Sequence, residues 1–357
     1  MDPEVLEGAS ALPFLAADHV ASINTIPSTF GQLNADGMFP AEGLPTAFVE
    51  IIIENGVIRA LPATPDGRPS SIARHEKSSS IILKIPNVSH EDSVMAVDLR
   101  DWLAMARRSR DGEDTLAGFV EKRHRRNRLK FDMTLEVMKM GALKGLIKDG
   151  AGDTLYDLNS IFGVTRKTVY FDLANTSTNV AEKIEEVVAW IEDHLINETA
   201  NGIEARVSPE FMTALINHAS FQKYFLQTPE AQALLAVGRS QSANGFSRTF
   251  DTRAGLVLRE YRARYTPWGA DSTVRLIDEG EGHAYPTGTI DVERTYVAPP
   301  IDMAELGSVG DTADLIHMTV EPMKHGRGEE WAYQMNALPV WSQPALVVDL
   351  DDGADPG

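Results

Sequence analysis

Residues 115–144 most constrain the fold of this 357-residue chain. The stretch lacks proline and has glycine only at Gly118 and Gly141, so it predicts an unbroken helix of about 45 Å. Residues at steps of three and four place one stripe on a helix face: Leu116, Val120, His124, Asn127, Phe131, Leu135, Met138 and Ala142. Such a helix exceeds what a globular core usually needs, and we expect it to act as a spine.

The first half of this helix is strongly basic. Against one acid, Glu121, stand Lys122, Arg123, Arg125, Arg126, Arg128 and Lys130. Such a run is most often a solvated face, or a face paired with acids of a neighbouring subunit. Contact with nucleic acid is a second interpretation, because a local patch can face DNA even in an acidic chain, and a membrane surface is a third.

The overall charge and the absence of cysteine exclude several classes of protein. With 33 basic and 52 acidic residues the chain carries −19, which disfavours tight, free-standing binding of nucleic acid. No cysteine is present, so disulfides, thiolate metal sites and thiol catalysis are excluded. The acidic start "MDPEVLEGAS" is unlike a secretory signal, and no apolar run approaches the roughly 20 residues that span a bilayer. We expect synthesis in the cytoplasm and no membrane contact.

Common catalytic motifs are missing. The sequence contains no phosphate loop of the G-x-x-x-x-G-K-[ST] type, no dinucleotide G-x-G-x-x-G turn, no H-E-x-x-H zinc helix and no G-x-S-x-G elbow. Nine histidines are scattered singly, whereas zinc sites gather several ligands. We therefore predict no enzyme, cofactor or metal, although a site assembled from distant residues stays open.

The stretch "GLIKDGAGDTLYDLNSIFGV", residues 145–164, consists of two apolar runs around an acidic, glycine-rich loop. Asp149 and Asp153 could suggest calcium. A calcium loop needs oxygen ligands at alternating positions and a closing acid, but Ala151 breaks the run and Asp157 falls in the second apolar run. The preferred interpretation is a glycine-permitted turn between two strands.

The rest of the chain divides by pattern. Residues 1 to about 45 show no sustained period and predict an arm that lies on something else. Strand-like runs at "FVEIIIENGVIRAL", with a hairpin signal at Asn55-Gly56, and at "IILKIP" flank a long polar loop, which predicts a projecting hairpin. Asn179 with Glu182, and Ser208 before Pro209, mark helix starts on either side of a strand, "GIEARV". Beyond residue 248 we expect mostly strands, and a disordered tail, "DDGADPG".

Several segments, taken in order, resemble the lambda-type major capsid proteins of tailed double-stranded DNA phages. The most specific are "GLIKDGAGDTLYDLNSIFGV", the helix start "SPEFMTALINH", the turn "YPTG" followed by "APP", and the closing "SQP". The resemblance runs from about Gln32 to Leu350. Each segment alone would be a weak signal, and their common order carries the resemblance.

The resemblance implies an α+β protein with the Hong Kong 97-type capsid fold. In this fold we expect an N-terminal arm over 1–46, an E-loop region over 47–98, and a P-domain over 99–170 that holds the spine helix 115–144 and the hairpin. An A-domain would follow over 171–312, the chain would return to the P-domain over 313–337, and 338–357 would form an A-domain strand and the tail.

The resemblance also implies a structural role: a major capsid protein whose copies, as hexamers and pentamers, form an icosahedral shell in the virion around double-stranded DNA. Implied partners are a separate scaffolding protein, a portal protein and a decoration protein, with assembly in the host cytoplasm. Candidate contacts between subunits are Arg68, Arg74 and Lys77 in the E-loop and Asp149 and Asp153 in the turn. A candidate inner-face basic patch is Arg123, Arg125, Arg126 and Arg128.

Two other functions stay open on the sequence alone. The same fold could form the shell of a cellular nanocompartment around an enzyme. A metal-dependent hydrolase with ligands from distant residues is the third class. Covalent cross-linking between subunits is known in part of the fold family and needs a suitably placed Lys and Asn. Lys77 in the E-loop is a candidate, but the proteins resembled here do not generally use such cross-links.

Overall fold

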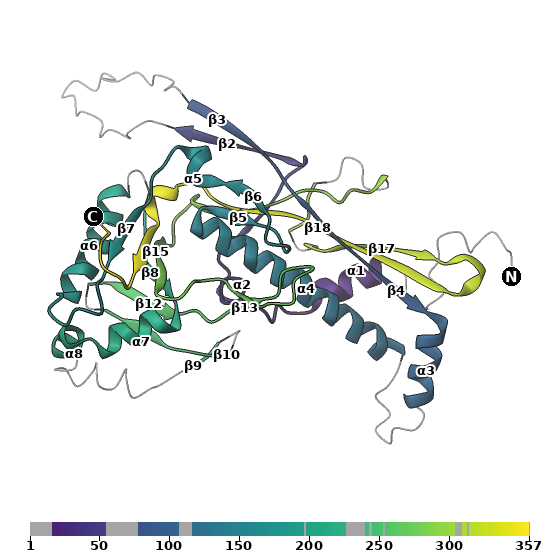
Figure 1. Ribbon diagram of the computed structural model, residues 1–357. Coiled ribbons are helices and arrows are strands. Elements are labelled where there is room, and N and C mark those ends of the chain that lie inside the picture. Colours follow the sequence, from purple (N-terminus) through teal and green to yellow (C-terminus); the bar gives the residue numbers. More distant parts are fainter. Residues whose placement is uncertain are drawn as a thin grey trace, which may run out of the picture. The chain divides into compact units, whose positions relative to one another are not determined.

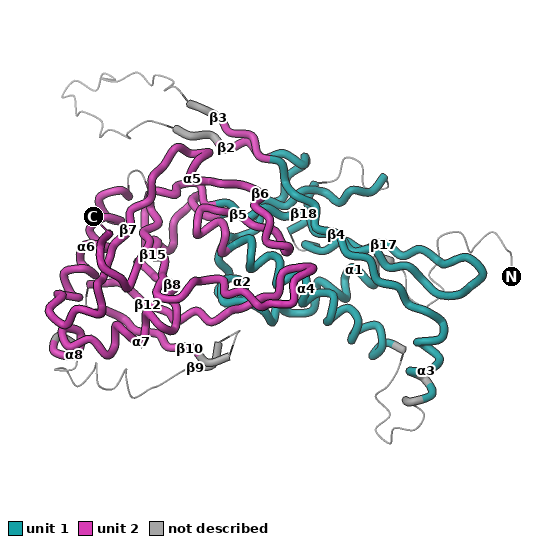
Figure 2. Tube along the Cα trace, in the orientation of Figure 1, with its two compact units in different colours: residues 1–48, 84–139, 294–340 teal, residues 49–83, 140–293, 341–357 magenta. Residues whose placement is uncertain are grey.

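The computed structural model describes residues 16–54, 78–106, 116–195, 198–225, 240–242, 245–252, 254–303, 309–312 and 314–356. The chain divides into two compact units, each made of three separate stretches (Figure 2). Unit 1 comprises 1–48, 84–139 and 294–340, and unit 2 comprises 49–83, 140–293 and 341–357. The chain therefore passes repeatedly from one unit to the other.

Among the described residues, unit 1 contains a five-stranded sheet with helices. Its strands are β1 (Ala41–Gly43), β4 (Asn87–Met95), β16 (Glu293–Val297), β17 (His317–Pro322) and β18 (Gly328–Trp341); β4, β17 and β18 are labelled in Figure 1. The order is β1–β16–β18–β17, and β4 also pairs with β18. Strand β18 is antiparallel to β17 and β4, whereas β1 is parallel to β16. The helices are α1 (Ala16–Thr25), α2 (Gln32–Ala35), α3 (Ala96–Ala106) and α4 (Leu116–Lys144), with a 3₁₀ turn at Lys324–Gly326.

Helix α4 confirms the predicted long helix, and its stripe forms part of a core. From Val120 to Ala142 every predicted stripe position is at most 7% exposed. The apolar members in unit 1 pack with α1, β4, β17 and β18 around Trp331 and Tyr333. Sheet and helix thus bury their apolar faces against each other, which is why a mostly polar helix of this length is stable in unit 1.

Unit 2 contains a six-stranded mixed sheet of order β11–β12–β8–β15–β19–β7. Its strands are β7 (Lys167–Tyr170), β8 (Gly202–Val207), β11 (Thr249–Asp251), β12 (Leu256–Glu260), β15 (Glu281–Thr287) and β19 (Val348–Asp351). Helices α6 (Val180–His194), α7 (Pro209–Asn217) and α8 (Ala219–Phe225) share one apolar core with the strands. Shorter elements are α5 (Leu158–Phe162), β9 (Ser240–Ser242), β10 (Gly245–Ser247), β13 (Arg264–Tyr265), β14 (Val274–Arg275) and a 3₁₀ turn, Pro344–Leu346.

The predicted helix starts in unit 2 are confirmed. The Ser208 hydroxyl accepts a hydrogen bond from the Phe211 backbone N–H at 3.2 Å, with Pro209 as the first helical residue of α7. Asn179 is the N-cap of α6, although its side chain makes no capping bond. The strand "GIEARV" between them is β8.

Two predicted hairpins are present. Strands β2 (Phe48–Glu54) and β3 (Ser78–Lys84) pair with each other, while the Asn55-Gly56 turn and the loop lie outside the described residues. Strands β5 (Leu146–Lys148) and β6 (Thr154–Asp157) are antiparallel around the turn 149–153. The second apolar run, however, is only partly strand. The Asp157 carboxylate accepts from the Ser160 backbone N–H at 3.1 Å and starts α5, because an Asp at this position is a good N-cap.

Replacing Gly145 with alanine is expected to destabilise the protein by about 2 to 3 kcal/mol. Gly145 has φ +78°, and an added Cβ would lie 2.5 Å from Asn159 Oδ1. Gly163, with φ +65° and no atom within 4 Å of an added Cβ, is a matched control, and its alanine variant should lose only about 1 kcal/mol. Urea unfolding measures both, and equal losses would show that the clash with Asn159 is unimportant.

The structure differs from the sequence-based expectations at both ends. The arm contains regular secondary structure, although its sequence has no sustained hydrophobic period. The elements are α1, α2 and β1, all within unit 1. The predicted disordered tail is ordered at its start, because Asp351 belongs to β19 and the Asp352 backbone N–H donates to Gly280 O at 2.9 Å. Sheet pairing therefore holds residues whose composition alone suggested disorder.

Candidate functional site

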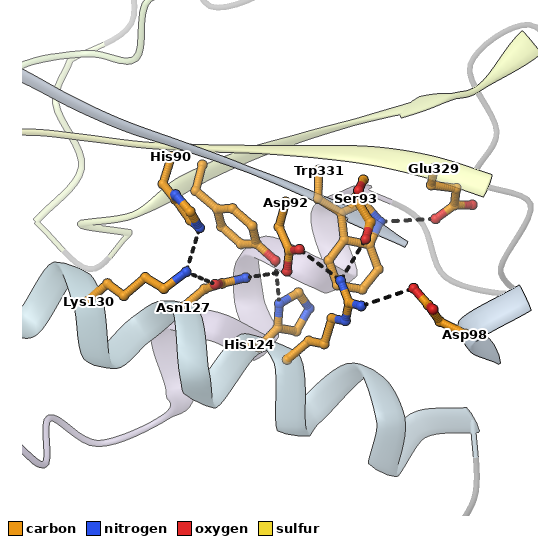
Figure 3. A network of polar contacts seen from close by, with 11 residues as sticks. His90, Asp92, Ser93, Asp98, His124, Asn127, Lys130, Glu329 and Trp331 are labelled. Carbon is orange, nitrogen blue, oxygen red and sulfur yellow. Dashed lines mark hydrogen bonds and ion pairs between the residues drawn. The ribbon is translucent and has the colours of Figure 1, made fainter. Parts of the chain in front are cut away.

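A polar cluster lies between α4 and strands β4 and β18 in unit 1 (Figure 3). We call it the helix–sheet cluster; it consists of His19, His90, Asp92, Arg123, His124, Asn127, Lys130, Glu329, Trp331 and Tyr333. Four of these side chains come from the predicted basic stretch and buried stripe of α4, and the strands supply most of the others. The cluster therefore fixes the helix on the sheet by polar contacts in addition to apolar packing.

Asp92 on β4 accepts hydrogen bonds from two side chains of α4. Its carboxylate receives a hydrogen bond from Arg123 Nη1 at 2.8 Å and from Asn127 Nδ2 at 3.0 Å. Arg123 also donates to Ser93 O at 2.7 Å and lies 3.5 Å from the Asp98 carboxylate. Half-buried, charge-assisted contacts of this kind add direction to the packing and set the rotation of α4 about its axis.

Two buried histidines connect α1 to α4. His19 Nδ1 and His124 Nε2 are 3.0 Å apart, and His124 Nδ1 lies 3.2 Å from Tyr333 Oη. Burial lowers the pKa of His19, and it lowers the pKa of His124 to about 4, with the neighbouring His19 as a further cause. Burial raises the pKa of Tyr333. Both imidazoles are therefore neutral in the folded protein at physiological pH.

The indole of Trp331 packs on both histidines. Its ring centroid is 5.2 Å from that of His124 and 5.3 Å from that of His19. Its Nε1–H donates to the Glu329 carboxylate at 3.1 Å, and both side chains are at most 2% exposed. At the other end of the cluster, Lys130 Nζ lies 2.6 Å from His90 Nε2. Burial first, and then the Lys130 charge, lower the pKa of His90.

A second face of α4 holds residues 31–38 of the arm. The Glu136 carboxylate, fully buried, accepts from the backbone N–H groups of Leu33 and Asn34 at 2.9 Å each. Lys139 Nζ donates to Met38 O at 2.8 Å. Because Glu136 receives two of the otherwise unpaired donors at the start of α2, it caps that helix from another element. The arm is thereby fastened to its own chain.

Unit 2 has its own buried polar groups. The Asp349 carboxylate lies 2.7 Å from both Arg166 Nη2 and His283 Nδ1. Arg206, only 1% exposed, donates to Tyr285 Oη at 2.9 Å, and burial raises the pKa of that tyrosine to about 12. These groups link β8, β15 and β19 to one another and to Arg166, the residue before β7, so they help to hold the strands of the sheet together.

The predicted basic patch is divided by the structure. Arg123 pairs with Asp92, and Arg128 pairs with Asp132 at 2.9 Å. Arg125 pairs with Glu121 on the exposed side at 2.7 Å, and Arg126 is exposed. Two of the four arginines thus stabilise unit 1 from within, which leaves Arg125 and Arg126 as the exposed members.

Of the predicted contacts between subunits, the structure describes the two in the turn. The Asp149 carboxylate accepts from the backbone N–H groups of Ala151 and Asp153 at 2.9 Å each, so it acts as a turn residue. Asp153 is exposed. Arg68, Arg74 and Lys77 lie outside the described residues. No role was predicted for Asp92, Glu136 or Asp349 from the sequence. His124 and Asn127, two polar residues within the predicted buried stripe, were the signal that could have indicated the cluster.

The buried polar groups described above position helices and strands within each unit. Within the described ranges, no group of three or more His, Asp or Glu side chains is placed to hold a metal ion. Helices in the same part of the chain also include none that is long and apolar enough to cross a membrane. The buried polar residues described above each bond to another side chain or to a backbone group, as expected of side chains that position secondary structure.

The fold and the sequence family together identify the class of protein. The model of the phage major capsid protein E family matches residues 17–351, and the chain belongs to this family. It is a shell-forming structural protein of the virion capsid, and the predicted α+β fold of the Hong Kong 97 type is confirmed.

Similar proteins agree with this assignment. The major capsid protein of Salmonella phage Felix O1 (isolate Felix O1-VT1) is 25% identical over 362 residues, covering 96% of this chain and 98% of its own. That of Pseudomonas phage KPP10 is 30% identical over 204 residues, covering 55% of this chain and 56% of its own. The solved structure of a prophage protein from E. coli CFT073 is 12% identical, with a TM-score of 0.55 over 93% of this chain and 97% of its own, and shows the same fold.

Proposed function

We propose that the chain forms hexamers and pentamers that close into an icosahedral shell around double-stranded DNA, without catalysis. The observation that supports this most is the family match, which spans both units from α1 to β19. Assembly in the host cytoplasm, on a separate scaffolding protein and around a portal protein, is part of the proposal, and so is later binding of a decoration protein.

Each unit is proposed to correspond to one capsid domain. Unit 1, with the arm, most of α4 and the β4–β18–β17 strands, would be the peripheral domain, and unit 2 the axial domain. Strands β2 and β3 would be the base of the E-loop, whose Arg68, Arg74 and Lys77 would meet acidic surface on a neighbour. A chain with a charge of −19 needs such opposite-charge contacts if identical copies are to adhere.

Packaged DNA is proposed to meet Arg125 and Arg126. These two arginines are exposed, while Arg123 and Arg128 are engaged inside unit 1. Arg126, together with Arg125 when it exchanges its exposed pair with Glu121 for a phosphate, fits weak, sequence-independent contact with DNA and agrees with the acidic balance of the whole chain.

The proposal predicts closed particles. Expressed together with the scaffolding and portal proteins of its own phage, the chain should give shells of hundreds of subunits, seen by electron microscopy and light scattering. Leaving out the scaffolding protein should give few or irregular particles. A stable monomer or dimer in the complete mixture would contradict the proposal.

A further inference from the structure

A tryptophan is exposed on unit 2 beside the turn 149–153. Trp268 is 79% exposed, whereas Trp331 and Trp341 are fully buried. It lies in the loop 266–273 that joins β13 and β14, and its backbone N–H donates to Gly150 O at 2.9 Å. The turn 149–153 and the loop 266–273 are therefore neighbours, and we refer to them together as the two-loop surface.

The backbone that carries Trp268 is held in place. The Ala270 N–H donates to Pro267 O at 3.1 Å across a turn in which Gly269 has φ +81°, as a type II turn requires. Beneath it Tyr265 is only 7% exposed, and its hydroxyl is 3.8 Å from where a Cβ on Gly152 would lie. An exposed aromatic ring on a fixed backbone can bind a partner with little loss of conformational entropy.

The two loops of this surface contain acidic residues and no basic residue. Asp153 and Asp271 are exposed and Asp149 is half-buried. An indole face attracts cations, and Trp and Arg are the residues most enriched where interfaces gain their energy. The two-loop surface therefore fits a compact basic segment.

The turn between β17 and β18 has the matching chemistry. Lys324, His325 and Arg327 are all exposed there, and no ion pair among the described residues uses any of them. The basic residues of α4 are a poorer match, because Arg123, Arg125 and Arg128 already pair with acids of their own chain.

We propose that the two-loop surface of one subunit binds the 324–327 turn of a second copy, with Trp268 as the aromatic anchor and Asp153 as an ion-pair partner. This inference rests on the proposed shell, because it names a contact between shell subunits. It assigns Asp153, a contact predicted from the sequence, to one particular basic segment of the neighbour.

Cysteine cross-linking tests the pairing, because the chain has no cysteine of its own. The double variant Ala151→Cys/His325→Cys, assembled into particles and treated with a short bismaleimide, should give a ladder of linked subunits on a denaturing gel. Each single variant should give none. Particles without a ladder would overturn the inference and leave the shell intact, whereas failure of the unmodified chain to form particles would count against the shell itself.

A second double variant, Ala151→Cys/Arg126→Cys, tests the competing basic partner on α4. A ladder from this variant, with none from the Ala151→Cys/His325→Cys chain, would overturn the proposed pairing in favour of the helix. The expected result is the reverse.

The energetic test replaces the anchor. Trp268→Ala should lower the yield of particles by about tenfold, while circular dichroism of the monomer stays unchanged. Val274→Ala, in the same hairpin and 41% exposed before replacement, should assemble normally.

A charge exchange tests the ion pair. Asp153→Lys should also impair assembly, and the additional replacement Arg327→Asp in the same chain should restore it. Normal assembly of Trp268→Ala, or failure of the charge exchange to restore particles, would contradict the proposal.

Discussion

Glu136→Ala is expected to lower the free energy of unfolding by about 3 to 5 kcal/mol, because it removes a buried carboxylate and leaves two backbone donors without an acceptor. The two donors are the N–H groups of Leu33 and Asn34, each 2.9 Å from the carboxylate. They belong to the first turn of α2, where no intrahelical acceptor exists. The N-cap residue, Gly31, has no side chain with which to replace Glu136.

Gly31 and Glu136 depend on each other. Gly31 has φ +94°, and an added Cβ would lie 2.1 Å from the Glu136 carboxyl carbon. The carboxylate therefore occupies the space that a side chain at Gly31 would take. Loss of Glu136 should loosen residues 31–38 on α4 before it unfolds unit 1, although the bonds from Lys139 Nζ to Met38 O and from Asn34 Nδ2 to Asp132 O would remain.

Urea unfolding and limited proteolysis together measure this effect. Glu136→Ala should show a lower unfolding midpoint and faster cleavage between residues 30 and 40, and Glu136→Gln should fall between the variant and the unmodified chain, because its amide keeps one acceptor oxygen. Glu121→Ala is the control on the same helix, since the exposed Glu121–Arg125 pair contributes at most about 0.5 kcal/mol. Equal midpoints for Glu136→Ala and Glu121→Ala would refute the capping role.

The elements that local sequence determines could be predicted. Helix α4 lacks proline and has an apolar stripe, so its limits were predicted to within one residue of Leu116–Lys144. The start of α7 at Ser208-Pro209 and the turn 149–153 follow from residues that are adjacent in the chain. In each case the side chain that forms the structure lies within a few residues of the backbone that it organises.

What could not be predicted depends on partners distant in the chain. Helix α1 has weak periodicity, and its His19 and Asn24 meet residues far along the sequence, His124 and Ile316. In the same way Glu136 looks like any other acid on a helix until residues 31–34 are placed against it. The division of the basic stretch into buried and exposed arginines also needed β4, because Asp92 is the acid that holds Arg123.

The stability of the protein is expected to fall by about 3 kcal/mol between pH 6.5 and pH 4 through His124 alone, at 1.36 kcal/mol per pKa unit. The pKa of this histidine is about 4 in the folded chain, against an ordinary value of 6.5. Between these values the unfolded chain binds a proton that the folded chain does not, so acid favours unfolding. The contribution is complete above pH 6.5 and is lost as the pH falls toward 4.

The surroundings of His124 explain why its imidazole is not protonated while the chain is folded. His19 on α1 faces it at 3.0 Å and is itself neutral, so a proton on either ring would place a charge against a buried imidazole. Tyr333 and Trp331 on β18 cover its other sides. Asp92 on β4 raises the pKa of His124, but this effect is smaller than the lowering by burial and by His19. Protonation should therefore separate α1 from α4 first, because His19 is the arm residue in the contact.

His124→Gln tests this reasoning, since an amide keeps polar contacts without titrating. Urea midpoints measured from pH 8 to pH 4.5 should fall steeply for the unmodified chain and less steeply for His124→Gln. The variant should therefore have a lower midpoint than the unmodified chain at pH 8, and the two midpoints should be nearly equal at pH 4.5. His325→Asn, at an exposed position with φ +65° that asparagine tolerates, should keep the full pH dependence. Groups that do not contact the two histidines are the same in all three proteins, so the difference in slope reports on the His19–His124 contact. If the urea midpoints of His124→Gln and of the unmodified chain depended on pH in the same way, protonation of His124 would not be the cause of the acid destabilisation.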